Sequence, residues 1–258
     1  MPLHFLLPAT PGAPAADAPT TGTTNAQAGD TVVLSGSEAH HAVAVRRVRV
    51  GEEVTVGDGR GTWLTGECEQ VSPREVVVRI ASRAEIPAPA PRIVLAQALA
   101  KGDRDELAVQ AATELGVDEI VPWQAARSVS RWDAAKAEKG RARWSSIVRE
   151  AAKQAHRAWI PDVSPLATTA TLGAWAAASR VVVLEPNAAV RLTDLDLAAP
   201  DARDVVLVVG PEGGIAPDEL ALLEAAGATL VRMGETVLRT STAGPAALAV
   251  VSAALGRW

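Results

Sequence analysis

The sequence predicts an α/β protein in which a small β-rich domain at residues 1–84 precedes a larger domain, residues 92–258, built on a parallel sheet. Three observations support this fold class. Residues 205–209 form an all-apolar run rich in β-branched residues, which is typical of a strand buried on both faces. Strand and helix patterns alternate along the rest of the larger domain. Between the two domains, the segment 85–91 has the sequence EIPAPAP and should form a semi-rigid linker.

The first domain consists of short strand patterns separated by turn residues. We expect strands at residues 3–7, 31–34, 54–56, 62–71 and 75–80. Residues 8–29 are rich in Pro, Ala, Gly and Thr without periodicity, which predicts a mobile loop. A short helix should begin with Ser37 as its cap and lead into a basic cluster of Arg46, Arg47 and Arg49. A domain of this size can fold alone.

In the larger domain we expect strands at residues 92–98, 118–122, 181–184, 205–209 and 228–233. Asp103 and Glu106 have the spacing of a capping box for a helix that ends at Gly116. A second, longer helix should cover residues 136–159, and residues 194–204 form an acidic connector. A third helix should begin at Pro217 and end at Gly227.

Two glycine-containing loops follow two of these strands. The sequence GPEGG at 210–214 follows one strand, and GETVLRT at 234–240 follows the next. Ligands of open α/β sheets bind beyond the carboxyl ends of the strands, so the loops predict a site for a small polar ligand. The alternative is a pair of ordinary strand-to-helix turns. Neither the dinucleotide motif GxGxxG nor a phosphate loop ending in GK[ST] is present in these loops.

The last helix should run to Leu255 and be capped by Thr240, Ser241 or Thr242. Pro245 is compatible with its start, because amides of the first turn have no partner within the helix.

Composition excludes several classes of protein. The chain has 258 residues and a net charge of −5, and its hydrophobic content of 48% is that of an ordinary globular protein. We expect a cytoplasmic protein, because no membrane-spanning run or secretory signal is recognisable. Cys68 is the only cysteine and the four histidines lack metal-type spacing, so we expect no disulfide and no metal. The acidic balance disfavours nonspecific nucleic-acid binding but leaves room for a local basic surface.

The helix expected at 136–159 carries such a basic surface. Arg149, Lys153 and Arg157 recur every four residues on one face, and Arg127 and Arg131 precede the helix. This arrangement suits the tracking of RNA phosphates. The alternative is a solvated helix face with no partner.

The sequence resembles a known family at these same places. GPEGG after a strand and LRTSTA at the start of the last helix resemble the SPOUT class of RNA methyltransferases. Within that class, the chain is similar to the ribosomal RNA small subunit methyltransferase E family, which methylates N3 of a uridine in 16S rRNA. The phrases SEAHHAVAVRRVRVGEEV, AKGDRDELAVQAATELGVDEIVPW and REAAKQAHRAWIPDV extend the resemblance over both domains.

The resemblance implies a trefoil knot in the larger domain, a PUA-like β-barrel that grips RNA in the smaller one, and a homodimer. It also implies that S-adenosylmethionine lies in the knot, between the two glycine loops and the end of an earlier strand. The residues expected to hold it are Leu184, Glu185, Gly210, Pro211, Glu212, Gly213, Gly214, Met233, Gly234, Val237, Leu238, Thr240 and Thr242. The residues expected to contact RNA are Arg46, Arg47, Arg49, Arg127, Arg149 and Lys153.

For catalysis, N3 of uridine carries a proton at neutral pH, so a base and a group that stabilises negative charge are needed. Arg157 and Arg239 are the candidates for charge stabilisation, and the resemblance places Gln154 beside Arg157 at the reaction centre. Many members of the family carry a glutamate where this chain has Ser241, and serine is a poor base. The base therefore stays unassigned.

The leading hypothesis is an S-adenosylmethionine-dependent 16S rRNA uridine-N3 methyltransferase that acts on the assembled small subunit. A non-catalytic RNA-binding protein that keeps the fold is the alternative, and Ser241 is the feature that favours it. A nicotinamide oxidoreductase is disfavoured by the missing GxGxxG motif.

Overall fold

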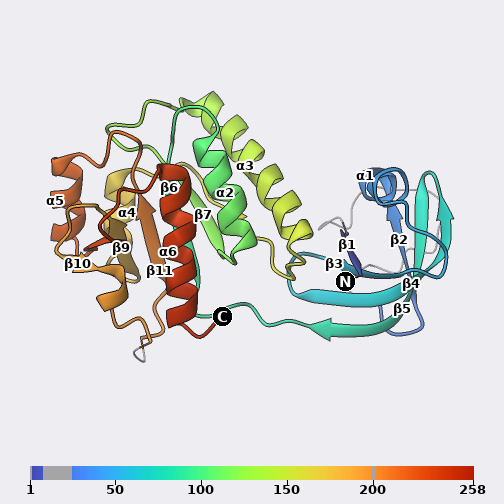
Figure 1. Ribbon diagram of the computed structural model, residues 1–258. Coiled ribbons are helices and arrows are strands. Elements are labelled where there is room, and N and C mark those ends of the chain that lie inside the picture. The colour runs from blue at the N-terminus through green and yellow to red at the C-terminus, as the bar shows by residue number, and fades with distance from the viewer. Residues whose placement is uncertain (1, 8–24, 199–200) are drawn as a thin grey trace. The chain divides into compact units, whose positions relative to one another are not determined.

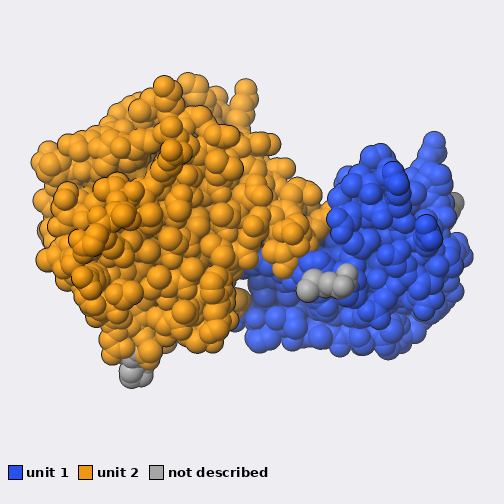
Figure 2. Space-filling model, in the orientation of Figure 1, with its two compact units in different colours: residues 1–88, 156–160 blue, residues 89–155, 161–258 orange. Residues whose placement is uncertain are grey.

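The computed structural model describes residues 2–7, 25–198 and 201–258. The chain forms two compact units, coloured separately in Figure 2: residues 1–88 with 156–160, and residues 89–155 with 161–258. The loop predicted at 8–29 lies largely outside the described residues, apart from its last part. The segment 156–160, which was predicted to end the long helix of the larger domain, belongs to the first unit.

The first unit is built on one five-stranded sheet (Figure 1). The strands are β1 Leu3–Leu6, β2 Thr31–Ser35, β3 Glu53–Gly57, β4 Thr62–Ser72 and β5 Glu75–Glu85, in the order β1-β3-β4-β5-β2. β1 is parallel to β3 and the other pairs are antiparallel. Alternate apolar residues of these strands form its core, including Phe5, Val32, Val54, Leu64 and Val78. Burial alternates along β2, β5 and the first half of β4, as in antiparallel sheets with one solvated face, whereas β1 and β3 are buried on both faces.

A short helical segment follows β2. Helix α1 covers Gly36–His40 and continues as a π-helical turn, η2, over His41–Val45. The prediction that Ser37 caps it is wrong, because Ser35 occupies the capping position and its side chain makes no capping bond.

The second unit contains a seven-stranded sheet in the order β10-β12-β9-β11-β6-β7-β8. All of its strand pairs are parallel, which confirms the predicted parallel sheet. The strands are β6 Ile93–Ala98, β7 Glu119–Trp123, β8 Asp162–Val163, β9 Arg180–Leu184, β10 Val190–Arg191, β11 Val205–Val209 and β12 Thr229–Arg232. The trefoil knot stays a prediction.

Helices cover both faces of this sheet. They are α2 Arg104–Glu114, α3 Ala134–Gln154, α4 Thr169–Trp175, α5 Pro217–Ala225 and α6 Thr240–Ala254, with a 3-10 turn, η3, at Leu192–Asp194. Helices α2 and α6 pack together on one face, α3 packs on α2, and α4 and α5 pack on the other face (Figure 1). Every residue of the central strands β6 and β11 is buried as a result. No helix among the described residues is long and apolar enough to span a membrane.

Helix α3 differs from its prediction at the C-terminal end. It stops at Gln154 rather than reaching residue 159, because the chain turns through His156, whose φ of 54° lies in the left-handed region. The expected basic face is also wrong at Lys153, whose side chain is buried with 6% exposure. Burial of Lys153 therefore interrupts the exposed basic face that the four-residue periodicity of the charges predicted.

The capping box predicted at Asp103 and Glu106 does not form. Asp103 occupies the capping position of α2 without a side-chain bond. Glu106 instead binds the guanidinium of Arg143 on α3, at 2.8 Å. The residue that anchors this turn is the buried Asp105, which accepts a hydrogen bond from the Ala100 amide at 3.0 Å.

Candidate functional site: a cavity between two glycine loops

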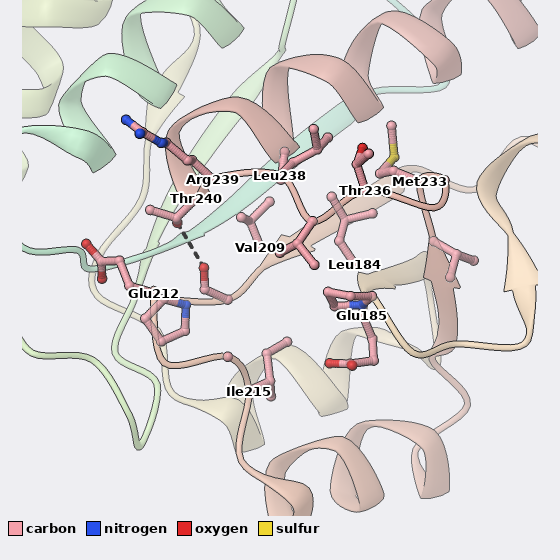
Figure 3. Close-up of a pocket in the computed structure, with 18 of the residues that line it drawn as sticks. Leu184, Glu185, Val209, Glu212, Ile215, Met233, Thr236, Leu238, Arg239 and Thr240 are labelled. Carbon is pink, nitrogen blue, oxygen red and sulfur yellow. Dashed lines mark hydrogen bonds between the residues drawn. The ribbon is translucent and has the colours of Figure 1, made fainter.

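A cavity of about 400 Å³ lies at the carboxyl ends of three neighbouring parallel strands, β9, β11 and β12. This is the edge at which open α/β sheets bind ligands. Figure 3 shows residues from the three connecting segments arranged around a common space. The lining residues are Arg104, Leu184, Glu185, Pro186, Val209, Gly210, Pro211, Glu212, Gly214, Ile215, Val231, Met233, Gly234, Thr236, Val237, Leu238, Arg239, Thr240 and Ala243.

The loop after β11, residues 210–216, forms one wall of the cavity. A Cβ atom at Gly210 would lie 2.7 Å from Cγ1 of Ile215, so only glycine fits where the strand turns. Gly214 has a φ of +71°, which a residue with a side chain rarely adopts. Pro217 then begins α5, as predicted. This wall therefore consists of glycine and proline backbone together with the side chain of Ile215.

The carboxylate of Glu219, in the first turn of α5, ties this wall to its surroundings. It accepts hydrogen bonds from the amides of Ala216 at 3.2 Å and Ala126 at 2.9 Å, and from the Thr169 hydroxyl at 2.6 Å. The loop after β7, the start of α4 and the start of α5 therefore meet at one carboxylate.

The segment after β12, residues 233–239, forms the opposite wall and leads into α6. The prediction that Thr240, Ser241 or Thr242 caps α6 is wrong: Arg239 is the capping residue and makes no side-chain capping bond. The Thr240 hydroxyl instead donates to the Gly210 carbonyl oxygen at 2.9 Å, which Figure 3 marks with a dashed line. Pro245 lies inside α6, beyond its first turn.

The cavity is apolar in its middle and charged at one edge. Leu184, Val209 and Leu238 supply apolar side chains. At the edge, Oε1 of Glu212 accepts hydrogen bonds from the Lys101 amide and from the Arg104 guanidinium, both at 3.0 Å. Glu212 and Arg104 therefore form an ion pair, and both residues line the cavity.

This pairing changes the acidity of Glu212. Burial of the carboxylate works to raise its pKa, but hydrogen bonds from the amides of Glu212 and Lys101 and from Arg104 together lower the pKa below its ordinary value. The other carboxylate that lines the cavity belongs to Glu185, whose Oε1 accepts bonds from the amide of Asn187 at 3.2 Å and from its side chain at 3.1 Å.

Most residues predicted to hold the cofactor line this cavity. The exceptions are Gly213 and Thr242. Gly213 faces away from it, since a Cβ atom there would lie 3.4 Å from Cβ of Arg127. Sequence reasoning missed the lining residues Arg104, Pro186, Val209, Ile215, Val231, Thr236 and Ala243. Val209 and Val231 could have been found as strand ends, whereas Arg104 comes from a distant segment and carries no local signal.

The two predicted catalytic arginines are in different places. Arg239 lines the cavity, whereas Arg157 does not and belongs to the segment 156–160 of the first unit. No group of three or more acidic, histidine or cysteine side chains suited to a metal ion occurs among the described residues.

The predicted RNA-contacting residues also differ in their surroundings. Arg46, Arg47 and Arg49 are exposed in the segment that follows η2. Arg127 is exposed, and its guanidinium donates to the Gly213 carbonyl oxygen at 3.1 Å. Arg149 is partly buried, in contrast to the exposed face predicted for it.

Comparisons with known proteins agree with this geometry. An RNA methyltransferase domain model matches residues 87–252, and an RNA methyltransferase PUA domain model matches residues 34–81. Ribosomal RNA small subunit methyltransferase E of Mycobacterium bovis is 45% identical over 89% of both chains. The Bacillus subtilis protein of the same name is 30% identical over 86% of this chain and 90% of its own.

Solved structures give the same result. Ribosomal RNA small subunit methyltransferase E from Neisseria gonorrhoeae, bound to S-adenosylmethionine, matches with a TM-score of 0.82 and 28% identity over 98% of both chains. A Legionella pneumophila protein in complex with the same cofactor matches with a TM-score of 0.81 and 31% identity, also over 98% of both chains. With the matched domains, these relatives and the cavity beyond β9, β11 and β12, this chain belongs to the ribosomal RNA small subunit methyltransferase E family.

Proposed function

We propose that this protein transfers a methyl group from S-adenosylmethionine to N3 of a uridine in 16S rRNA, and that it acts in the cytoplasm as a homodimer. The observation that carries the proposal is the cavity between two glycine loops, in a chain whose relative of known structure is bound to that cofactor. We also propose that the substrate is 16S rRNA within the assembled small ribosomal subunit.

The residues present fit S-adenosylmethionine. A cavity of about 400 Å³ is within the usual range for small-molecule sites. Its apolar walls at Leu184, Val209 and Leu238 suit a flat adenine ring, and a Cβ atom at Gly234 would meet nothing within 4 Å, so the bare backbone there leaves room for the ligand. Amides of the two loops would supply the hydrogen bonds that orient the adenosine part.

When bound, S-adenosylmethionine supplies a sulfonium methyl group, so that N3 of uridine gains a methyl and loses its proton. The chain must hold N3 in line with that methyl group and accept the proton. Glu212 is a weak candidate for the base, because its pKa is lowered and its Oε1 already accepts two hydrogen bonds. Glu185 is the other carboxylate of the cavity and is the first residue to test in this role.

Arg239 would stabilise the negative charge that develops on the uracil oxygens, because it lines the cavity. Arg157 does not line it. Its proposed role would require that the RNA site include residues from both subunits of the proposed homodimer.

The proposal is tested with pure protein, labelled S-adenosylmethionine and unmodified small subunits, followed by mass spectrometry of the nucleosides. N3-methyluridine at one position supports it. Methylation of naked 16S rRNA but not of the particle would contradict the assembled substrate. Failure to bind the cofactor would favour the alternative of a non-catalytic RNA-binding protein, for which Ser241 is the supporting feature.

The proposed RNA surface of the first unit is tested separately. Replacing Arg46 and Arg47 by Ala should weaken RNA binding most at low salt, because phosphate contacts release counterions. Replacing the exposed Arg74 by Ala in the same unit is the control. A loss that does not depend on salt would contradict a phosphate contact.

A further inference from the structure

A glutamine lies in the middle of the sheet beneath the cavity. Strand β6 is apolar except for Gln97, whose side chain has 0% exposure. Gln97 pairs in register with Val209, the last residue of β11, on one side and with Pro122 of β7 on the other. It therefore lies at the level where the cavity begins, but it does not line the cavity.

The Gln97 side chain is connected to both walls of the cavity through one hydroxyl group. Its Nε2 donates to Oγ1 of Thr240 at 2.9 Å, and this Oγ1 donates its own proton to the Gly210 carbonyl oxygen at 2.9 Å. Thr240 begins α6 after the second loop, and Gly210 begins the first loop. The chain of hydrogen bonds thus joins β6, the first loop and the second loop.

The hydroxyl of Thr240 has only one proton to donate, and the Gly210 carbonyl takes it. Thr240 is also 6% exposed. Its proton is therefore committed within the fold, so the Thr240 hydroxyl cannot donate to a cofactor without giving up the bond to Gly210. The bond holds the peptide plane between Gly210 and Pro211, and the fixed φ of proline carries that orientation into the loop.

Gln97 is costly for stability. Its Oε1 is buried and has no hydrogen-bond partner among the described residues. An unsatisfied buried polar atom destabilises a fold, and an apolar side chain would suit this strand better. The opposite orientation of the amide would set Oε1 against the Ala98 carbonyl oxygen, to which Nε2 donates at 3.3 Å. A residue that costs stability in a core points to a function.

We propose that Gln97 is a positioning residue for S-adenosylmethionine: through the Thr240 hydroxyl, it sets the Gly210 carbonyl and so the spacing of the two loops that enclose the adenosine part. The inference rests on the proposed function, because it takes that cofactor as the ligand. It makes Gln97 a determinant of cofactor affinity that never touches the cofactor.

The first test replaces Gln97 by Met, which has a similar size and no hydrogen-bonding amide. We expect the Kd for S-adenosylmethionine, measured by calorimetry on the full chain, to rise about tenfold, the value of roughly one hydrogen bond. The Tm without ligand should stay the same or rise, because the unsatisfied Oε1 is removed. A purely structural residue would lower the Tm and the affinity together, and that outcome would overturn the proposal.

The matched control is Ser252→Ala. Ser252 is 1% exposed on α6, and its Oγ has no hydrogen-bond partner among the described residues. This variant should likewise keep or raise the Tm, but it should leave the Kd unchanged because Ser252 is not connected to either loop. If the Kd of Ser252→Ala rose as much as that of Gln97→Met, any change to a buried polar residue near the sheet would disturb the site. That result would overturn the specific role of Gln97.

The second test separates the hydroxyl of Thr240 from its shape. Thr240→Val keeps the shape and removes the hydroxyl, so the Kd should rise at least as much as in Gln97→Met. Thr240→Ser keeps the hydroxyl and should restore most of the affinity. Equal Kd values for Val and Ser would overturn the proposal. Failure of the unaltered protein to bind would instead overturn the proposed function, so the two failures are distinguishable.

Discussion

The two walls of the cavity are held in different ways. The wall at 210–216 is bonded on several sides, by Thr240 at the Gly210 carbonyl, by Arg104 at Glu212 and by Arg127 at the Gly213 carbonyl. The wall at 233–239 is more open, and Val237 is 77% exposed. Glu235 pairs with Arg191 at 3.7 Å, with both side chains exposed. The first wall is therefore pre-organised, and we expect the second, which is more exposed, to adjust when ligands bind.

This difference suggests a division of roles. A pre-organised wall lowers the entropy lost on binding and suits recognition of the cofactor. An open wall that carries Arg239 suits the RNA substrate, which must enter and leave in each cycle. The comparison predicts that changes in the first wall alter cofactor affinity and that loss of the Arg239 side chain from the second wall alters turnover.

The largest effect is expected from Arg239→Ala in the open wall. Removal of one group that stabilises developing charge typically lowers kcat by about a hundredfold or more. The Kd for S-adenosylmethionine should stay within about twofold, as measured by calorimetry beside single-turnover methylation. Arg157→Ala is the informative companion, and unchanged turnover in that variant would remove Arg157 from the reaction. A large rise in Kd for Arg239→Ala would break the division of roles.

The next effect is expected from Gly210→Ala in the pre-organised wall. The new Cβ would lie 2.7 Å from Ile215 Cγ1, so Ile215 or the loop must shift. Overpacking of this kind costs about 1–3 kcal/mol, and we expect cofactor affinity to fall about tenfold to a hundredfold. Gly213→Ala is the control, because its Cβ would face Arg127 at 3.4 Å, outside the cavity. Equal losses in both variants would argue against the specific close contact.

A smaller effect is expected at the Arg104–Glu212 pair. The pKa of Glu212 is lowered in the folded protein, so the ion pair stabilises the fold above the ordinary carboxyl pKa. This contribution is lost as the pH falls through the lowered pKa. Glu212→Gln should therefore reduce the Tm by roughly 2 °C or less at neutral pH. The difference from the unaltered protein should vanish in acid, and a difference that persists there would contradict the electrostatic explanation.

The same two regions show how far the sequence could predict the site. Glycine and proline restrict the backbone locally, so the sequence could bring GPEGG, apart from Gly213, and the residues after Gly234 to one cavity. The long-range contacts were missed, because Gln97 and Arg104 reach the loops from distant parts of the chain. No local pattern distinguishes a glutamine that bonds Thr240 from one that does not.

Charge periodicity was the weakest guide. The basic face of α3 was predicted from a four-residue repeat, which assumes that the helix continues and that its face stays in solvent. The helix ends at Gln154 and Lys153 is buried, so both assumptions fail within one turn. Where a helix ends and what packs on it are tertiary properties. The parallel sheet and its five longer strands were predicted correctly, because buried β-branched runs are visible locally in the sequence. The two-residue strands β8 and β10 were missed, because they carry no such run.

The smallest effect is expected from Arg191→Ala, which removes the ion pair of the open wall. Side chains of Arg191 and Glu235 are 54% and 83% exposed, and water and salt screen such a pair. Cofactor Kd should therefore change by less than about twofold and the Tm should stay the same. The Arg191–Glu235 pair is an ion pair of the open wall, and the Arg104–Glu212 pair is an ion pair of the pre-organised wall. The cofactor Kd values of Arg191→Ala and Glu212→Gln therefore compare how much each ion pair contributes to its wall. A loss of affinity larger than that of Glu212→Gln would show that the second wall is also pre-organised, and the division between a fixed and a mobile wall would then fail.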